Sequence, residues 1–273
     1  MRTLAIVNVK GGVGKTTTAV HVAAGLAGRG LRTLLIDADP QGNVGLVLGI
    51  RAPATIREVL LGEIGAGDAL VPDVRPGLSV ITATPAAFAL DAALAGTVQR
   101  ETLLVRRLGS LHGFDAVVID SSPAMGLLTY NALLAAQELI VPVGMDTLAI
   151  AGARQTLDGV REIRALWPDR RLELAAVLPI AVNLQTYASR AALEAIQQDP
   201  EMGPRLFQPG IRQCIDLTYA AAAHETIWEY APKSRAAEDY DALIRRLMPA
   251  GPDDRKATRD GEEDSTDVYR APQ

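Results

Sequence analysis

The segment Val9–Thr17 carries the residue types best suited to chemistry on a phosphate group. It reads Val-Lys-Gly-Gly-Val-Gly-Lys-Thr-Thr. Glycines allow positive φ and let backbone N–H groups approach phosphate oxygens, while a following Lys-Thr pair supplies an ammonium for the phosphates and a hydroxyl for Mg²⁺. The segment therefore predicts a nucleotide-phosphate site, and its members are Gly11, Gly12, Val13, Gly14, Lys15, Thr16 and Thr17.

This segment departs from the general Walker A pattern in one position. The pattern has a glycine five residues before Gly14, whereas this chain has Val9 there, followed by an additional lysine, Lys10. Only four of the 27 basic residues are lysines, and two of the four, Lys10 and Lys15, stand in this loop. We interpret Lys10 as a functional cation, because the departure at Val9 otherwise has no purpose.

Carboxylates follow two other apolar runs. Asp37 and Asp39 come directly after Leu34–Ile36, and Asp120 ends Ala116–Ile119. A Mg²⁺–phosphate site needs carboxylates that orient metal-bound water and the attacking water. An apolar run ending in Asp120 has the Walker B form, which holds Mg²⁺.

The elements that must position these residues alternate between strands and helices. Strands are predicted at Leu4–Val9, Thr33–Asp37, Leu78–Thr82, Ala116–Asp120, Glu138–Val143 and Leu174–Ile180. Helices are predicted at Lys15–Arg29, Thr55–Leu61, Val98–Leu111, Leu127–Ala136, Ala149–Trp167, Ala188–Gln198 and Arg235–Leu247. Strands that are apolar at nearly every position predict a parallel sheet covered on both faces. The pattern predicts an α/β fold, a doubly wound and mostly parallel sheet flanked by helices, with its ligand at the carboxyl ends of the strands.

The length fits one large α/β domain or two small ones, and we predict a single domain over residues 1–249, followed by a disordered charged tail over 250–273. The chain has 273 residues, 48% of them apolar, and a net charge of −5, which is unlike the strongly basic balance of a dedicated nucleic-acid protein. The single cysteine, Cys214, excludes a disulfide framework within the chain. No signal peptide or membrane span is predicted, and we expect a cytoplasmic protein.

Taken together, these motifs resemble the ParA family of partition ATPases, which belongs to the deviant Walker A group together with MinD-like proteins. The resemblance covers residues 2–247. It is carried by the segments 10–18 (Lys-Gly-Gly-Val-Gly-Lys-Thr-Thr-Thr), 36–43 (Ile-Asp-Ala-Asp-Pro-Gln-Gly-Asn), 114–120 and 131–133.

The resemblance implies a P-loop ATPase that uses ATP and Mg²⁺ and forms an ATP sandwich homodimer. Lys10 would cross the dimer interface to the partner's nucleotide, and Lys15 would serve the phosphates of its own subunit. Asp39 would position the hydrolytic water, while Thr16, Asp37 and Asp120 would serve the metal. Catalysis is thus assigned to Lys10, Lys15 and Asp39.

The resemblance also implies partners, namely a ParB-like protein or cargo adaptor and nonspecific DNA. Two departures bear on this. The family usually has Pro-Pro soon after the Walker B aspartate, whereas this chain has Ser121-Ser122-Pro123. Asp216 stands near the place of an arginine that the family uses for DNA. Other basic groups are available in three clusters: Arg161, Arg164, Arg170 and Arg171; Arg100, Arg106 and Arg107; and Arg245 with Arg246.

The motifs raise four candidate functions. The first is an ATPase that positions a chromosome, a plasmid or a protein assembly on DNA. The second is a MinD-like regulator at a membrane surface, against which the acidic residues after Arg235–Leu247 argue. The third, an electron-transfer ATPase of the nitrogenase iron-protein type, is excluded by the lone Cys214. The fourth is a nucleotide-dependent scaffold without turnover, against which Lys10 and Asp39 argue. The three histidines, His21, His112 and His224, show no metal-ligand spacing and are interpreted as structural.

Overall fold

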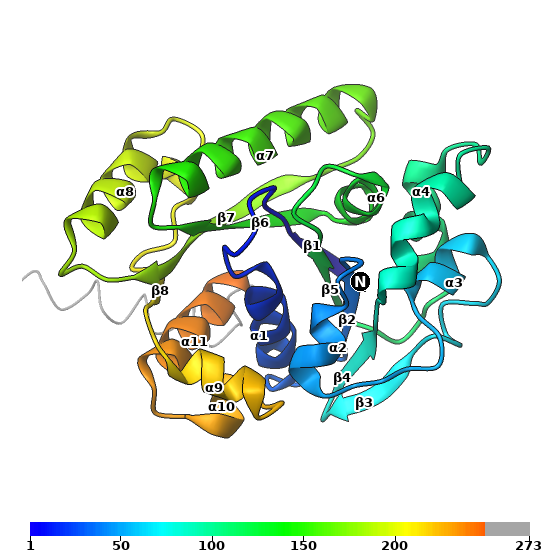
Figure 1. Ribbon diagram of the computed structural model, residues 1–273, viewed down its shortest axis with the longest axis horizontal. Helices are drawn as coiled ribbons and strands as arrows, with labels where there is room; N and C mark the ends of the chain where they lie inside the picture. Colours follow the sequence, from blue (N-terminus) through cyan, green and yellow to red (C-terminus); the bar gives the residue numbers. More distant parts are fainter. Residues whose placement is uncertain (249–273) are drawn as a thin grey trace, which may run out of the picture.

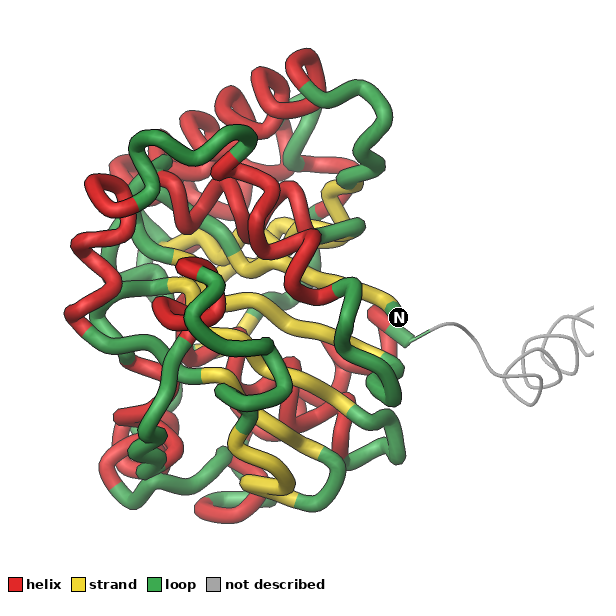
Figure 2. The backbone as a smooth tube through the Cα atoms, turned by 90° about the vertical axis from the view of Figure 1, so that its right-hand side faces the viewer, coloured by secondary structure: helices red, strands yellow, loops and turns green. Residues whose placement is uncertain are grey.

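The computed structural model describes residues 1–248, which form three layers around a central sheet (Figures 1 and 2). The predicted tail at 250–273 lies outside the described residues, and so does residue 249, the predicted end of the domain. The sheet has eight strands in the order β3-β4-β2-β5-β1-β6-β7-β8. All neighbours pair in parallel except β3 and β4, which are antiparallel. The bounds are β1 Arg2–Ile6, β2 Thr33–Ala38, β3 Val71–Arg75, β4 Leu78–Ile81, β5 Ala116–Ser121, β6 Glu138–Gly144, β7 Glu173–Val182 and β8 Ile211–Arg212.

The two faces of the sheet are apolar because successive side chains of a strand point to opposite sides. In β5, Val118 packs into one core cluster while Val117 and Ile119 pack into another. Strands β2 and β5 are buried at all six positions. This accounts for their uninterrupted apolar runs and confirms the predicted sheet covered on both faces.

Helices complete the two outer layers (Figure 1). One face carries α1 Lys15–Ala27, α2 Asn43–Leu48, α9 Asp216–Ala222, α10 Ile227–Tyr230 and α11 Arg235–Leu247. The other face carries α3 Ile56–Leu61, α4 Leu90–Ala93, α5 Leu103–Leu108, α6 Leu127–Ala135, α7 Thr147–Leu166 and α8 Tyr187–Gln198. Three short 3₁₀ turns lie at Pro85–Ala89, Arg100–Thr102 and Gly203–Arg205. Among residues 1–248, no helix combines the length and apolarity that crossing a membrane requires.

The six predicted strands and seven predicted helices are present; the bounds of Arg235–Leu247 are confirmed, and the others have shifted ends. Strand β1 ends at Ile6 rather than Val9, because the chain leaves the sheet there to form the glycine loop. The predicted helix Val98–Leu111 is shorter, since a 3₁₀ turn precedes α5. Strands β3 and β8 and helices α2, α4, α9 and α10 are absent from the prediction; β8, α4 and α10 have two to four residues, which is too short to show a period, and β3 is exposed or half-buried along its length and so lacks a buried apolar run.

The apolar stripe of α11 belongs to the core. Tyr240, Leu243, Ile244 and Leu247 are at most 5% exposed and pack in the cluster that includes α1. A Cβ at Gly25 of α1 would lie 2.7 Å from Ile244, so α1 and α11 approach closely there. This stripe is therefore occupied by intramolecular packing.

His21 joins α1 to the C-terminal helices and confirms the structural interpretation of this histidine. It is 2% exposed, its Nδ1 lies 2.7 Å from the Thr17 carbonyl oxygen, and its Nε2 accepts a hydrogen bond from the Ile227 N–H at 3.0 Å. Its ring also stacks on Tyr240. A neutral ring with the proton on Nδ1 satisfies both hydrogen bonds, and burial lowers the pKa of His21 to about 4.

This buried ring predicts a loss of stability in acid. Between pH 6.5 and about 4 the unfolded histidine binds a proton that the folded one excludes, so stability falls as pH falls through this window. From pH 7 to pH 5, His21 should cost about 2 kcal/mol of unfolding free energy. Urea unfolding of the wild type and of His21→Gln at both pH values measures this. The difference between the two proteins should shrink at pH 5, and a constant difference would contradict the argument.

Candidate phosphate-loop site

The glycine loop lies between β1 and α1, at the carboxyl end of the central strands. Gly12 and Gly14 have φ of +76° and +78°, which an L side chain rarely adopts. A Cβ at Gly12 would meet nothing within 4 Å, so the backbone there borders open space. Gly14 is the N-cap of α1, and no side chain caps this helix. The first N–H groups of α1 are therefore available to an anion, as the sequence predicts.

Lys15 and Thr16 begin α1 and face the acidic strand ends. The Lys15 ammonium donates to the Lys10 carbonyl oxygen at 3.0 Å, and the Thr16 hydroxyl donates to Asp120 Oδ2 at 2.6 Å. Burial lowers the pKa of Lys15, while the charges of Asp120 and Asp39 act in the opposite direction. Residues distant in sequence thus meet in one site because β1, β2 and β5 are neighbours in the sheet.

Asp37 and Asp120 stand side by side on the paired strands β2 and β5. Both Asp37 oxygens accept backbone N–H groups, from Asp39 and from Val44, each at 3.0 Å. Asp37 therefore holds the chain that follows β2. Asp39 is 5% exposed, and its Oδ1 accepts the Gln41 N–H at 3.0 Å.

Burial and neighbouring charges raise the pKa values of Asp37 and Asp120. Burial, opposed by the two backbone hydrogen bonds and reinforced by the charge of Asp39, raises the pKa of Asp37 to about 7. Burial and the charge of Asp37 raise the pKa of Asp120 well above its ordinary value. A site that concentrates negative charge in this way favours the binding of cations.

The residues present fit a magnesium ion. Asp120 Oδ1 is buried without a hydrogen-bond partner within the described residues, and it belongs to the carboxylate that accepts the Thr16 hydroxyl. Hydroxyl and carboxylate oxygens are the ligands that Mg²⁺ prefers, and the ion usually takes further oxygens from water and phosphate. In residues 1–248, no group of three or more His, Cys, Asp or Glu side chains is arranged to hold a metal alone.

Lys10 is the more exposed of the two lysines in the loop. Within residues 1–248 its ammonium has no hydrogen-bond or ion-pair partner, while its backbone N–H donates to Asn8 Oδ1 at 2.9 Å. Its side chain is partly exposed, in contrast to that of Lys15, which is 7% exposed. The two lysines of the loop therefore differ in burial and in the contacts of their ammonium groups within residues 1–248.

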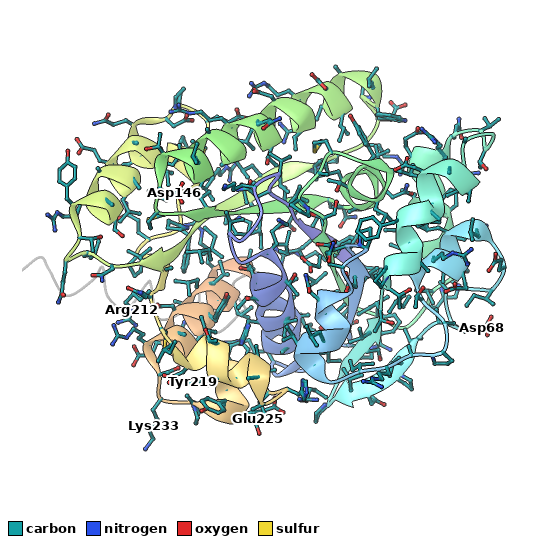
Figure 3. All side chains as sticks on the ribbon, in the orientation of Figure 1. Asp68, Asp146, Arg212, Tyr219, Glu225 and Lys233 are labelled. Carbon is teal, nitrogen blue, oxygen red and sulfur yellow. The ribbon has the colours of Figure 1, made fainter. Side chains whose placement is uncertain are left out.

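Beside the loop lies a cavity of about 930 Å³ that the sequence did not reveal. It extends from Gly14 and Thr17 between the end of β7 and the α9 region. Its lining includes Ile180, Ala181, Ile211, Arg212, Gln213, Cys214, Ile215, Asp216, Leu217 and Tyr240. Polar and charged side chains, among them Thr218, Ser234 and Arg235, share the walls with apolar ones, and a mixed lining of this kind can hold the base and sugar of a nucleotide. Figure 3 shows Arg212 and Tyr219 on the side of the molecule that bears this region.

Asp216 belongs to this cavity as well as to α9. It is the first residue of α9, and its Oδ2 accepts the Cys214 thiol at 3.3 Å. Its negative charge therefore lies beside the candidate nucleotide site.

A second, smaller cavity of about 250 Å³ adjoins Asp39. Ser122 and Pro123, which belong to the segment Ser121-Ser122-Pro123, line it together with the exposed Phe88. The Ser122 hydroxyl donates to the Ala124 carbonyl oxygen at 3.3 Å. The segment after the Walker B strand thus borders the carboxylate that is predicted to position water.

Most members of the three arginine clusters already have partners. Arg161 pairs with Asp158 and Glu201, and Arg171 pairs with Glu173. Arg100 lies within ion-pair distance of Asp91 and Glu101. The side chains of Arg106, Arg164 and Arg246 donate to backbone carbonyl oxygens. For Arg170 and Arg245, the structure gives no ion pair within residues 1–248. A phosphate backbone would have to compete with these internal contacts.

Comparison with known proteins assigns the family. Residues 1–173 match a family model described as an AAA domain. The chain is 38% identical over 251 residues to the chromosome-partitioning ATPase Soj of Thermus thermophilus, covering 91% of this chain and 96% of that protein.

Solved structures agree with this relationship. Apo McdA of Cyanothece has a TM-score of 0.83 at 25% identity, covering 91% of this chain and 100% of that one. Cobyrinic acid a,c-diamide synthase of Mycobacterium smegmatis, with a bound ATP analogue and magnesium, has a TM-score of 0.79 at 34% identity over 90% and 94% of the two chains. The chain therefore belongs to the ParA/Soj family of partitioning ATPases.

Proposed function

We propose that this ATPase positions or segregates an intracellular cargo, such as a chromosome, a plasmid or a protein assembly. ATP drives two copies together, the dimer binds DNA without sequence preference, and a ParB-like protein or cargo adaptor stimulates hydrolysis and release. The observation that carries the proposal is the pair of lysines in one loop, of which Lys15 faces its own site and Lys10 presents an ammonium without a partner in residues 1–248.

The proposed roles follow from the positions of the side chains. The loop N–H groups of residues 11–17 and the Lys15 ammonium bind the phosphates. Thr16 and Asp120 hold Mg²⁺, which neutralises charge on the phosphate oxygens. Asp37 serves the metal indirectly, by fixing the segment that carries Asp39 through two backbone hydrogen bonds. Asp39 orients the attacking water toward the γ-phosphate.

Dimerisation completes the site in this proposal. The transition state of phosphoryl transfer gathers negative charge on the transferred group, and a cation supplied by a second subunit stabilises it. Lys10 of each copy reaches the nucleotide of the other copy. Hydrolysis then depends on the dimer, and an ATP-bound dimer persists until a partner completes or rearranges the site.

The DNA contact is proposed for exposed arginines rather than for Asp216. Arg245 lies at the end of α11 and Arg170 follows α7, and neither has an ion pair within the described part of the chain. A dimer doubles every such patch, and binding to phosphates grows with the number of contacts. The nucleoid would be the location of the ATP-bound dimer.

Lys10→Ala tests the proposed cation in trans. The variant should retain most of its ATP affinity, because Lys15 remains, and its turnover should fall about 100-fold or more, as for loss of a charge that stabilises the transition state. Nucleotide titration and phosphate release measure the two quantities. Lys233→Ala is the control, since Lys233 is exposed and projects away from the molecule (Figure 3). Full turnover by Lys10→Ala would remove the argument for a shared site.

A further inference from the structure

The segment that carries Lys10 is held by side chains rather than by the sheet. The last ladder contact before it is the Val7 N–H, which donates to the Ile140 carbonyl oxygen at 3.1 Å. Beyond that point, the Val9 N–H donates to Thr156 Oγ1 at 3.0 Å and the Lys10 N–H donates to Asn8 Oδ1 at 2.9 Å. Two side-chain oxygens therefore fix the backbone that directs Lys10.

Thr156 is itself fixed in the helix α7. It is fully buried, and its hydroxyl donates to the Gly152 carbonyl oxygen at 2.8 Å, which turns the oxygen's acceptor side toward Val9. Asn8 is fixed in the same way, because its amide donates to the Pro142 carbonyl oxygen at 2.7 Å. Both acceptors are thus oriented before a nucleotide arrives.

Gly152 brings α7 against the same segment. A Cβ at Gly152 would lie 2.8 Å from Lys10 Cβ and 3.2 Å from Asn8 Oδ1. Gly152 and Thr156 are four residues apart and lie on one face of α7. The helix therefore meets the Lys10 segment by close contact at one turn and by a hydrogen bond at the next.

We infer that this face of α7 sets the direction in which Lys10 leaves its own subunit, with Thr156 as the positioning residue and Gly152 as the space it requires. This inference rests on the proposed function of Lys10. Thr156 and Gly152 act through the Lys10 backbone, and within residues 1–248 the Thr156 hydroxyl hydrogen-bonds only to Val9 and Gly152, not to the loop residues 11–17. A displacement of about 1 Å in a catalytic cation can lower a rate about 100-fold. Substitutions at Thr156 or Gly152 that shift Lys10 should therefore lower turnover.

The test compares variants of the full chain in ATP affinity and in turnover. Thr156→Val keeps the shape of the side chain and removes the acceptor of the Val9 N–H, while Thr156→Ser keeps the acceptor. Gly152→Ala adds a Cβ that would lie 2.8 Å from Lys10 Cβ, so the Lys10 segment must shift. Gln155→Val is the matched control, because it places valine at the neighbouring exposed position of the same helix. Thr156→Val and Gly152→Ala should lower kcat roughly 10-fold to 100-fold and change the Kd for ATP by less than about twofold.

Thr156→Ser and Gln155→Val should keep the wild-type kcat. Normal turnover by Thr156→Val, or a loss in ATP affinity that matches its loss in turnover, would overturn the inference. Lys10→Ala in the same assay distinguishes the proposed role of Lys10 from the positioning role of Thr156 and Gly152. If Lys10→Ala loses turnover and Thr156→Val does not, the positioning role alone fails. If Lys10→Ala keeps full turnover, the proposed function of Lys10 fails.

Discussion

Replacing Lys15 by alanine is expected to abolish measurable ATP binding. The Lys15 ammonium is the buried cation at the start of α1, and it lies near the carboxylates Asp120 and Asp39. Without it, the phosphates would meet these carboxylates with no charge to offset them. Loss of a charged, preorganised contact of this kind should weaken ATP binding by about 100-fold or more.

Calorimetric titration of Lys15→Ala with ATP and Mg²⁺ measures this loss. Circular dichroism should show the wild-type helix content, since α1 keeps its apolar face and alanine favours helix. Lys233→Ala, which changes an exposed lysine, should bind ATP as the wild type does. If Lys15→Ala binds ATP with unchanged affinity, the phosphate-loop assignment is wrong.

Replacing Asp39 by alanine should stop turnover and leave an ATP-bound dimer. Asp39 is buried beside the second cavity, and its backbone is held by Asp37. The change removes the carboxylate proposed to orient water and keeps Lys10, Lys15 and the loop. Turnover should fall about 100-fold or more, as is typical when a general base is removed.

Light scattering with ATP and with ADP detects the trapped dimer, and phosphate release gives the turnover. Asp169→Ala is a matched control, because Asp169 is exposed after α7. It should hydrolyse ATP normally and return to the monomer. Normal turnover by Asp39→Ala would disprove the assigned role.

The fold was predictable from sequence where strands are buried on both faces. Runs such as Leu34–Ile36 and Val117–Ile119 are apolar at each position because helices cover both sides of the sheet, and this feature is visible without coordinates. Strand β8 has only two residues, so its sequence shows no period. The same holds for the four-residue helix α10, whose position depends on contacts with α9 and α11.

Within the site, the glycine-loop motif was predictable from sequence, and the contacts that other elements make with it were not. Gly14, Lys15 and Thr16 are adjacent in sequence, so their joint chemistry can be recognised there. The position of Thr16 next to Asp120 depends on strand order, which brings together residues 104 apart. Thr156 comes from a helix that follows β6 and has no motif of its own. The large cavity escaped prediction because its walls come from β7, β8, α9 and α11, which are distant in sequence from the glycine loop.

Binding of DNA by Asp39→Ala, with ATP and Mg²⁺ and over a series of salt concentrations, tests the central claim most directly. The ATP form should bind DNA of unrelated sequences equally, its affinity should fall steeply as salt rises, and the ADP form should bind far more weakly. That result would mean that arginines such as Arg170 and Arg245 contact DNA despite Asp216. Absence of binding by the ATP form at low salt would contradict positioning on DNA, and binding to anionic liposomes would then point to the MinD-like alternative.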